Sequence, residues 1–264
     1  MPRGAIALAE ARADGGPSQL IEPERWWRRA DVLAWVEARA GEDVLIGFDM
    51  SFAAPFIDAG AYLPGGPVLR DPAELWAEVE RCSAGDPDLG THGFITAHAR
   101  HFYFGAASGP KRNLQRWRVC EEGFNAAGGG KASSIFDCVG ASQVGKGSFA
   151  GMRLLHRLRG QVAVWPFDPA PPRGAVLCEI YTRAFIRHAG LRGLKLRTPA
   201  ALDEALAALS APPARLGGTL TDHQTDVLLS AAGMRALAGE GRWWQPEGMT
   251  AEVARVEGWT FGVA

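Results

Sequence analysis

Apolar positions along the chain follow two periods, which together indicate an α/β protein. Short apolar runs are typical of strands buried between helices, whereas apolar residues spaced three or four apart are typical of amphipathic helices. The runs predict strands at 6–9, 44–49, 135–139, 161–165 and 175–181. The spaced positions predict helices at 29–40, 72–81, 149–158, 182–189, 199–209 and 222–238. A helix that leads into a strand favours a mixed or parallel sheet flanked by helices.

Residues 53–135 are less regular than the segments on either side. Proline and glycine turns interrupt them, and no clear linker separates them from the rest of the chain. We therefore expect one α/β domain over 1–264, with 53–135 as an insertion beside the core sheet.

Carboxylates stand where two predicted strands end and where the last predicted helix begins. Asp49 and Glu179 follow apolar runs, and the helix carries Asp222 and Asp226 one turn apart. Several acids that meet at one site are costly to bury unless a cation holds them together. Three acids in the order strand, strand, helix are typical of phosphoryl chemistry that depends on Mg²⁺ or Mn²⁺.

Each acid also has a structural interpretation. Asp49 can cap the turn that follows its strand, and Glu179 can pair with Arg183 one turn later. Asp222 can stabilise the start of its helix through the helix dipole.

Local sequence favours a close approach of the last helix to the sheet. Thr221 and Gln224 have the spacing of a capping box, which begins a helix here. Small residues, Ser230 and Gly233, continue the face of Asp226, so we expect this helix to bring Asp226 toward the strand ends.

The composition of the chain indicates where in the cell we expect the protein. Hydrophobic residues make up 47% of the chain, yet no run approaches the ~18 apolar residues of a membrane span. The N-terminus has no export signal, and four scattered cysteines without a CxxC pair fit free thiols. We expect a cytoplasmic protein with no membrane partner.

Charge is unevenly distributed along the chain. Residues 101–200 hold 15 lysines and arginines against 5 acids, whereas the remainder holds 13 against 24. A basic face that binds nucleic acid has this composition, although charges close in sequence also disperse over different faces. The candidates for nucleic-acid contact are Lys111, Arg112, Arg116, Arg118, Lys146 and Arg183, with Trp117 as a stacking or core residue.

A glycine-rich stretch at 140–148 nearly matches a phosphate-binding loop. It has the glycine and lysine of GxxxxGK[ST], but Gly147 replaces the residue whose hydroxyl would hold Mg²⁺. A structural turn is the simpler interpretation, and an ATPase is a third functional hypothesis.

Two histidines, His98 and His101, have helical i, i+3 spacing. No cysteine or acid lies within the same few residues, so we interpret them as surface or core histidines rather than metal ligands.

Five separated motifs together resemble an uncharacterised bacterial family of predicted nucleases with a ribonuclease-H-like fold. They are VLIGFDMSFAAPF at 44–56, the stretch from 124 to 158, VWPFDP at 164–169, CEIYTRAF at 178–185 and DHQTDVLLSAA at 222–232. The resemblance implies that Asp49 is the acid of the fourth core strand, Glu179 an acid near the fifth, and Asp226 the acid of the final helix. The spacing of His223 and Asp226 is similar to the last helix of Holliday-junction resolvases, so His223 or Asp222 is implied as a further metal ligand.

The chain departs from that family at its start. Relatives begin with a central strand that carries an Ile-Asp-Trp-Ser-like run and the first catalytic acid, whereas this sequence opens on Ala5-Ile6-Ala7-Leu8, similar to the second strand. We expect a start codon assigned too far downstream, the alternative being loss of that strand and its ligand. The main hypothesis is a metal-dependent nuclease, and the alternative is a catalytically inactive protein of the same fold that binds nucleic acid or a protein partner.

Overall fold

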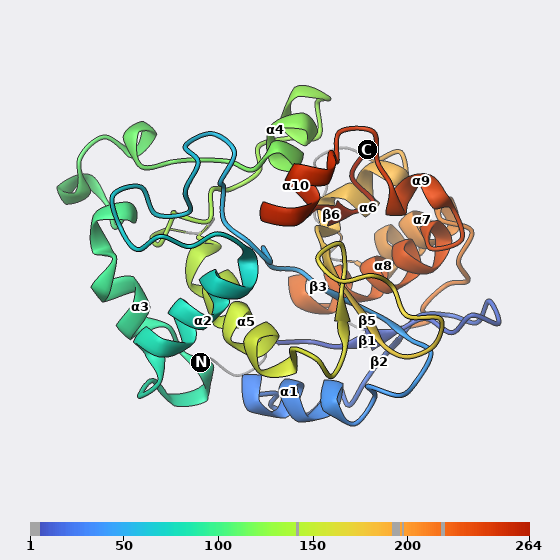
Figure 1. Ribbon diagram of the computed structural model, residues 1–264. Coiled ribbons are helices and arrows are strands. Elements are labelled where there is room, and N and C mark those ends of the chain that lie inside the picture. The colour runs from blue at the N-terminus through green and yellow to red at the C-terminus, as the bar shows by residue number, and fades with distance from the viewer. Residues whose placement is uncertain (1–5, 141–142, 192–195, 197, 218–219) are drawn as a thin grey trace.

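A parallel sheet of four strands lies at the centre of the molecule (Figure 1). The computed structural model describes residues 6–140, 143–191, 196, 198–217 and 220–264. β5 (Val176–Ile180) is the central strand, with β3 (Leu45–Phe48) on one side. β4 (Ala163–Val164) and β6 (Thr260–Phe261) share its other side. All three pairings are parallel, so the carboxyl ends of the strands lie at one edge of the sheet.

Ten α-helices surround the strands in the described residues. They are α1 (Arg29–Glu37), α2 (Pro72–Ser83), α3 (His92–Ala97), α4 (Val119–Ala126), α5 (Gly145–Leu158), α6 (Thr182–His188), α7 (Pro199–Ala208), α8 (Asp222–Leu237), α9 (Gly241–Trp244) and α10 (Ala251–Val256). Figure 1 shows α2, α3 and α5 on one side of the sheet and α6 to α9 on the other. No helix in the described part of the chain has the length and apolar composition that a bilayer crossing requires.

Each face of the sheet packs against its own hydrophobic core. Leu177 belongs to the cluster that includes α1, α2, α3 and α5, whereas the next residue, Cys178, belongs to the cluster that includes α6, α7 and α8. Successive residues of a strand point to opposite faces, so β5 is buried on both sides. The sequence prediction of an α/β protein with a mostly parallel sheet flanked by helices is confirmed.

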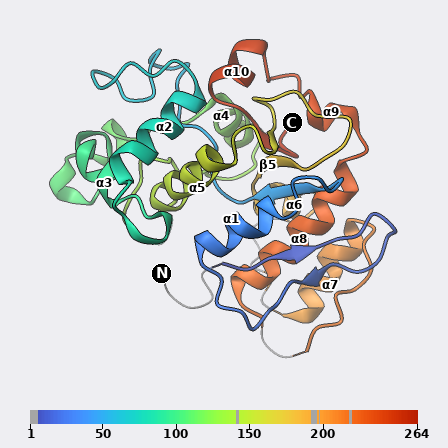
Figure 2. The same cartoon turned by 60° about the horizontal axis from the view of Figure 1, so that its bottom comes forward.

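A separate antiparallel pair, β1 (Ala9–Glu10) and β2 (Gln19–Leu20), packs against α8. In the described residues this pair forms its own sheet and makes no ladder with β3. Figure 2 shows the pair in front of α8. Within the described residues, β3 therefore pairs with β5 on one edge and has no strand on its other edge. The first strand that the sequence resemblance implies does not occur in this part of the chain.

One predicted strand is wrong. Residues 135–139 form turns, with a single isolated bridge between Tyr103 and Asp137. Ile135, Phe136 and Cys138 are nevertheless buried, and Phe136 packs against Phe102, which itself packs against Phe149 of α5, whereas Val139 is exposed. A short apolar run predicts burial well but does not by itself distinguish a strand from a packed turn.

The predicted insertion, 53–135, contains α2, α3 and α4. Its buried side chains, among them Leu75, Val79 and Phe94, belong to the same cluster as those of α5. The segment is therefore packed on the core and covers one face of the sheet.

Candidate functional site

A cavity of about 950 Å³ opens between the β1–β2 pair and β3. Two chain segments form its sides: residues 6–11, which include β1, and residues 44–51, which include β3. Helix α8 lines one face through Val227 and Met234, and α1 and α5 line another through Val36 and Leu154. The cavity thus has helices on two faces and β1 and β3 on its sides. A strand in the middle of a parallel sheet has similar neighbours.

Three predicted acids, Asp49, Glu179 and Asp226, line this cavity. The pairing of β3 with β5 places Phe48 opposite Glu179, so Asp49 follows at the same edge of the sheet. Asp226 reaches the edge from α8. The structure therefore brings together the three acids that the sequence predicted to converge.

Small residues allow α8 to lie close to the elements that carry the other acids. A side chain at Gly47 of β3 would overlap Met234 of α8, and one at Gly233 of α8 would overlap Phe185 of α6. The hydroxyls of Ser230 and Thr182 lie 3.0 Å apart across the contact between α8 and α6. The sequence placed the small face of α8 against the sheet, but Ser230 and Gly233 contact α6, and the close contact with β3 depends on Gly47.

Asp49 has an unusual electrostatic environment. Its side chain is exposed to the cavity, yet protein surrounds it on most sides. Loss of solvation raises the pKa of Asp49 to about 7, with further contributions from the negative charges of Asp226 and Glu179. A hydrogen bond with Thr182 acts in the opposite direction. Loss of solvation and two neighbouring acids thus let the Asp49 carboxyl group retain a proton up to about neutral pH.

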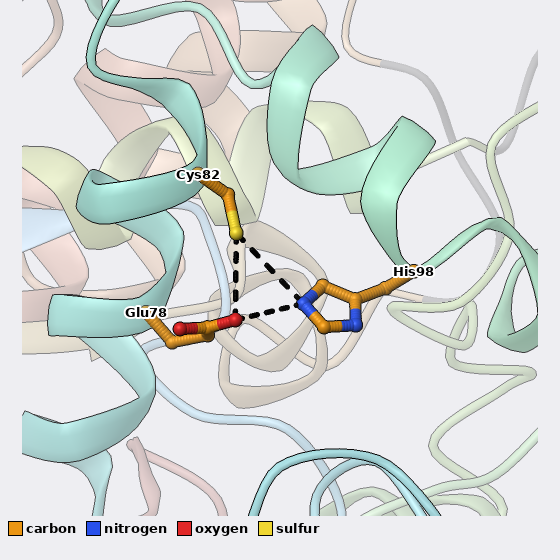
Figure 3. Close-up of side chains that lie close together, drawn as sticks. All are labelled: Glu78, Cys82 and His98. Atoms are coloured by element: carbon orange, nitrogen blue, oxygen red, sulfur yellow. Dashed lines mark hydrogen bonds and ion pairs between the residues drawn. The ribbon is translucent and has the colours of Figure 1, made fainter.

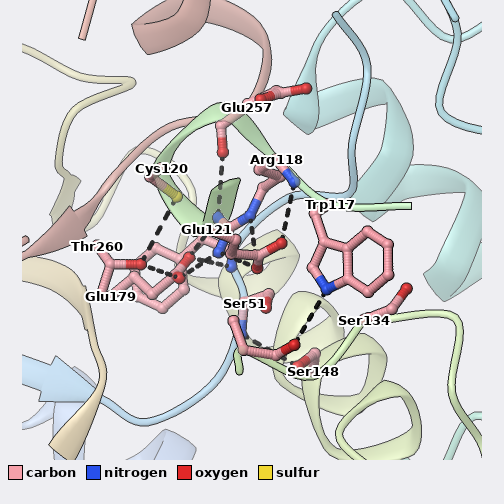
Figure 4. A network of polar contacts seen from close by, with 12 residues as sticks. Ser51, Trp117, Arg118, Cys120, Glu121, Ser134, Ser148, Glu179, Glu257 and Thr260 are labelled. Carbon is pink, nitrogen blue, oxygen red and sulfur yellow. Dashed lines mark hydrogen bonds and ion pairs between the residues drawn. The ribbon is translucent and has the colours of Figure 1, made fainter. Parts of the chain in front are cut away.

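Glu179 is buried and has a complete set of hydrogen bonds (Figure 4). Its Oε2 accepts from the backbone N–H of Phe52 (2.8 Å) and from Nη1 of Arg118 (2.7 Å). Its Oε1 accepts from the hydroxyl of Thr260 (2.7 Å) and from Nη2 of Arg118. A carboxylate offers about four lone-pair positions, and protein donors occupy all of them. Glu179 therefore acts on the cavity through its charge and through the backbone at Phe52, which does not match its predicted role as a metal ligand.

Arg118 holds the centre of this buried network. Its guanidinium, 1% exposed, also donates to Oε1 of Glu121 (2.9 Å from Nη2) and to the carbonyl of Glu257 (3.2 Å). Burial raises the pKa of Glu121, whereas Arg118 opposes that rise. Arg118 was predicted to contact nucleic acid, but a guanidinium enclosed by carboxylates does not reach a phosphate at the surface.

Of the other two predicted metal ligands, His223 lines the cavity and Asp222 does not. His223 is exposed and lines the cavity with Asp226. Asp222 is the first residue of α8 and is not among the residues that line the cavity. The predicted capping box is confirmed, because Thr221 and Gln224 exchange backbone-to-side-chain hydrogen bonds of 3.0 and 3.2 Å.

The predicted basic patch does not form one surface. Arg116 is bound to Asp58 through two hydrogen bonds of 2.6 and 2.7 Å and also donates to three backbone carbonyls. Lys111 pairs with the buried carboxylate of Asp137. Both are structural contacts, and Trp117 likewise donates to the carbonyl of Ala132 (3.0 Å). The exposed members of the predicted set are Arg112, Lys146 and Arg183.

The glycine-rich stretch starts a helix. Gly145 is the first residue of α5, and a side chain there would overlap the carbonyl oxygen of Ile135. The hydroxyl of Ser148 is buried and accepts the backbone N–H of Ser51 (3.0 Å). Residues 141 and 142 of the stretch lie outside the described residues. Both Gly145 and Ser148 thus have packing roles, which favours the structural interpretation over an ATP site.

A second cluster of potential metal ligands lies away from the cavity. Glu78 and Cys82 of α2 meet His98, which directly follows α3, and their ligand atoms lie within 4.8 Å of one another (Figure 3). This cluster could hold a metal ion. The sequence interpretation of His98 was incomplete because its partners come from another helix, α2, which extends past the predicted end at 81 and so includes Cys82.

Comparisons with known proteins add no assignment. No family model, no curated protein and no solved structure matches this chain.

Proposed function

We propose that this protein is a divalent-metal-dependent phosphodiesterase that acts on nucleic acid, with Asp49 and Asp226 as the metal-binding carboxylates. One observation supports the proposal most strongly. Loss of solvation, together with the negative charges of Asp226 and Glu179, raises the pKa of Asp49 to about 7 in a cavity that all three acids line. Carboxylates that disfavour each other's ionisation are stabilised when a cation binds between them.

The proposal includes a ribonuclease-H-like arrangement of the core. Three features support it: adjacent parallel strands β3 and β5 that lead to acids, a long late helix that carries an acid, and an antiparallel pair on the far side of the cavity from β3.

The donor atoms suit a hard divalent ion. Carboxylate oxygens are the ligands that Mg²⁺ and Mn²⁺ prefer, and His223 adds a nitrogen donor that Mn²⁺ accepts better than Mg²⁺. Such an ion would supply positive charge that stabilises a phosphodiester under in-line attack by water. Glu179 contributes by fixing the backbone at Phe52, three residues after Asp49, and so holds the loop that carries Asp49.

The start of α5 provides a complementary feature for phosphate. Its first turn lines the same cavity, and Ser148 is tied to Ser51 beside Asp49. The N-terminus of a helix carries a partial positive charge and N–H groups that favour an anion. A phosphate between this turn and an ion on Asp49 would have positive charge on both sides.

A second candidate function is binding of nucleic acid or a protein partner without catalysis. The saturated hydrogen bonds of Glu179 favour it, because, of the three acids that the sequence predicted to converge, only Asp49 and Asp226 then remain as potential metal ligands.

Cleavage of branched DNA, duplex DNA and RNA–DNA hybrids with Mn²⁺ tests the main proposal. We expect cleavage by the wild-type protein, and loss of cleavage in Asp49→Asn and Asp226→Asn. Asp222→Asn is the matched control on α8, because Asp222 does not line the cavity. Equal cleavage by wild type and Asp226→Asn would contradict the proposed site. Binding of Mn²⁺ and nucleic acid without cleavage would favour the second function.

A further inference from the structure

We propose that Glu78, Cys82 and His98 form a binding site for a transition-metal ion of the Zn²⁺ class, which joins α3 to α2. The site is separate from the acidic cavity, since none of the three residues lines it. The inference goes beyond the proposed nuclease function and does not depend on it.

Geometry is the first argument. His98 Nε2 lies 3.0 Å from Glu78 Oε1, Cys82 Sγ lies 3.4 Å from the same oxygen, and Sγ and Nε2 lie 4.0 Å apart. Ligand atoms around a tetrahedral zinc ion lie roughly 3.3 to 3.6 Å from one another, given zinc bond lengths of about 2.0 to 2.3 Å. Each observed separation is within a few tenths of an ångström of this range.

The three donor side chains come from α2 and from the residue that follows α3. Glu78 and Cys82 lie one turn apart and share a face of α2, and Figure 3 shows both side chains directed at the Nε2 edge of His98. The ring of His98 packs against buried Phe94, with 4.8 Å between ring centroids. Residual exposure is low, at 10% for the Glu78 side chain and 12% for that of His98. The three donors are thus preorganised rather than spread over a mobile surface.

Charge is the third argument. Arg81 places one guanidinium nitrogen 2.8 Å from Glu78 Oε1 and 3.3 Å from Cys82 Sγ, so a positive group already contacts two of the donors. Arg81 also donates from Nε to Glu78 Oε2 (2.8 Å), but its side chain is 70% exposed, so it can turn into solvent when an ion takes that position. A sulfur, an imidazole nitrogen and one carboxylate oxygen form a donor set that suits Zn²⁺ and does not suit Mg²⁺ or Ca²⁺. Three protein ligands leave a fourth position for water.

Zinc titration of the chelator-treated and dialysed full chain tests the site. We expect one high-affinity equivalent of Zn²⁺, measured by competition with a chromophoric chelator, and a sulfur-to-metal charge-transfer band when Co²⁺ replaces Zn²⁺. Cys82→Ala and His98→Gln should each weaken binding by more than the roughly 10- to 100-fold that follows loss of a residue outside the ligand shell. Cys82→Ala should also abolish the charge-transfer band.

Three controls make the result specific. His92→Gln alters an exposed histidine of the same helix and should leave the affinity unchanged. Arg81→Gln removes the competing cation and should bind Zn²⁺ at least as tightly as wild type. Asp226→Asn should keep the zinc equivalent, which separates this site from the acidic cavity. Circular dichroism confirms that each variant is folded, and unchanged Zn²⁺ affinity in folded Cys82→Ala and His98→Gln would overturn the proposal.

Discussion

Asp226 on α8 and Asp49 at the end of β3 line one cavity, where loss of solvation and the negative charge of Asp226 both raise the pKa of Asp49. They come from distant parts of the chain and meet because Gly47 lets α8 lie against β3. Electrostatic repulsion between two carboxylates costs stability unless a proton or a cation intervenes.

Stability should fall as the pH rises through neutrality. Folded Asp49 has a pKa of about 7, above its ordinary value of 3.8, so the folded state binds this proton more tightly than the unfolded chain does. The resulting stabilisation is complete below about pH 4 and is lost as the pH passes 7. Water in the cavity screens the interaction, so we expect a loss of about 1–2 kcal/mol between pH 5 and pH 8. Urea unfolding at several pH values measures it, and Asp49→Asn should remove this component.

Divalent ions should stabilise the protein more at pH 8 than at pH 5.5. At the lower pH the proton on Asp49 competes with the ion, whereas at the higher pH the ion relieves the repulsion between the carboxylates. The increase in melting temperature with Mn²⁺ should be lost in Asp226→Asn and retained in Asp222→Asn. An increase of the same size at both pH values would argue against Asp49 as a ligand.

Arg118 should matter more for folding than either of its carboxylate partners. Arg118→Gln leaves Glu179 and Glu121 buried without their cation, which should cost about 3–5 kcal/mol of unfolding free energy. Glu179→Gln should cost less, because Glu121 still neutralises Arg118. Urea denaturation of both variants ranks them. The reverse order would show that Glu179 carries most of the stabilisation in this network.

Gly145 should be required for packing, and Lys146 should not. Gly145→Ala would place a methyl group against the backbone carbonyl of Ile135, and overpacking of this kind typically costs about 1–3 kcal/mol. Lys146 is exposed, so Lys146→Ala should leave stability within about 0.5 kcal/mol of wild type. Addition of Mg-ATP should leave the melting temperature unchanged. A clear increase that Lys146→Ala abolishes would instead support a nucleotide site.

Sequence periodicity predicted the elements that carry the acids. Long periodic segments such as α8 and the apolar runs of β3 and β5 were placed within a residue or two. The convergence of Asp49 and Glu179 followed from simple geometry, since the carboxyl ends of neighbouring parallel strands meet at one edge. The two-residue strands β2 and β6 were missed because so few residues carry no detectable alternation.

Side-chain partners were beyond what the sequence could predict. Glu179 was expected to bind a metal or to pair with Arg183, yet it pairs with Arg118, 61 positions earlier. His98 acquires Cys82 as a neighbour only when α2 and α3 pack together. Contacts of this kind depend on tertiary packing, and spacing along one segment does not identify a partner from another segment.

The space between β1 and β3 separates the β1–β2 sheet from the four-stranded sheet. Because each strand faces it with an edge that lacks a ladder partner in the described residues, main-chain donors and acceptors are available on both sides. Helix α8 contacts both β1 and β3 and carries Asp226, so a displacement of this helix would move that aspartate relative to both strands.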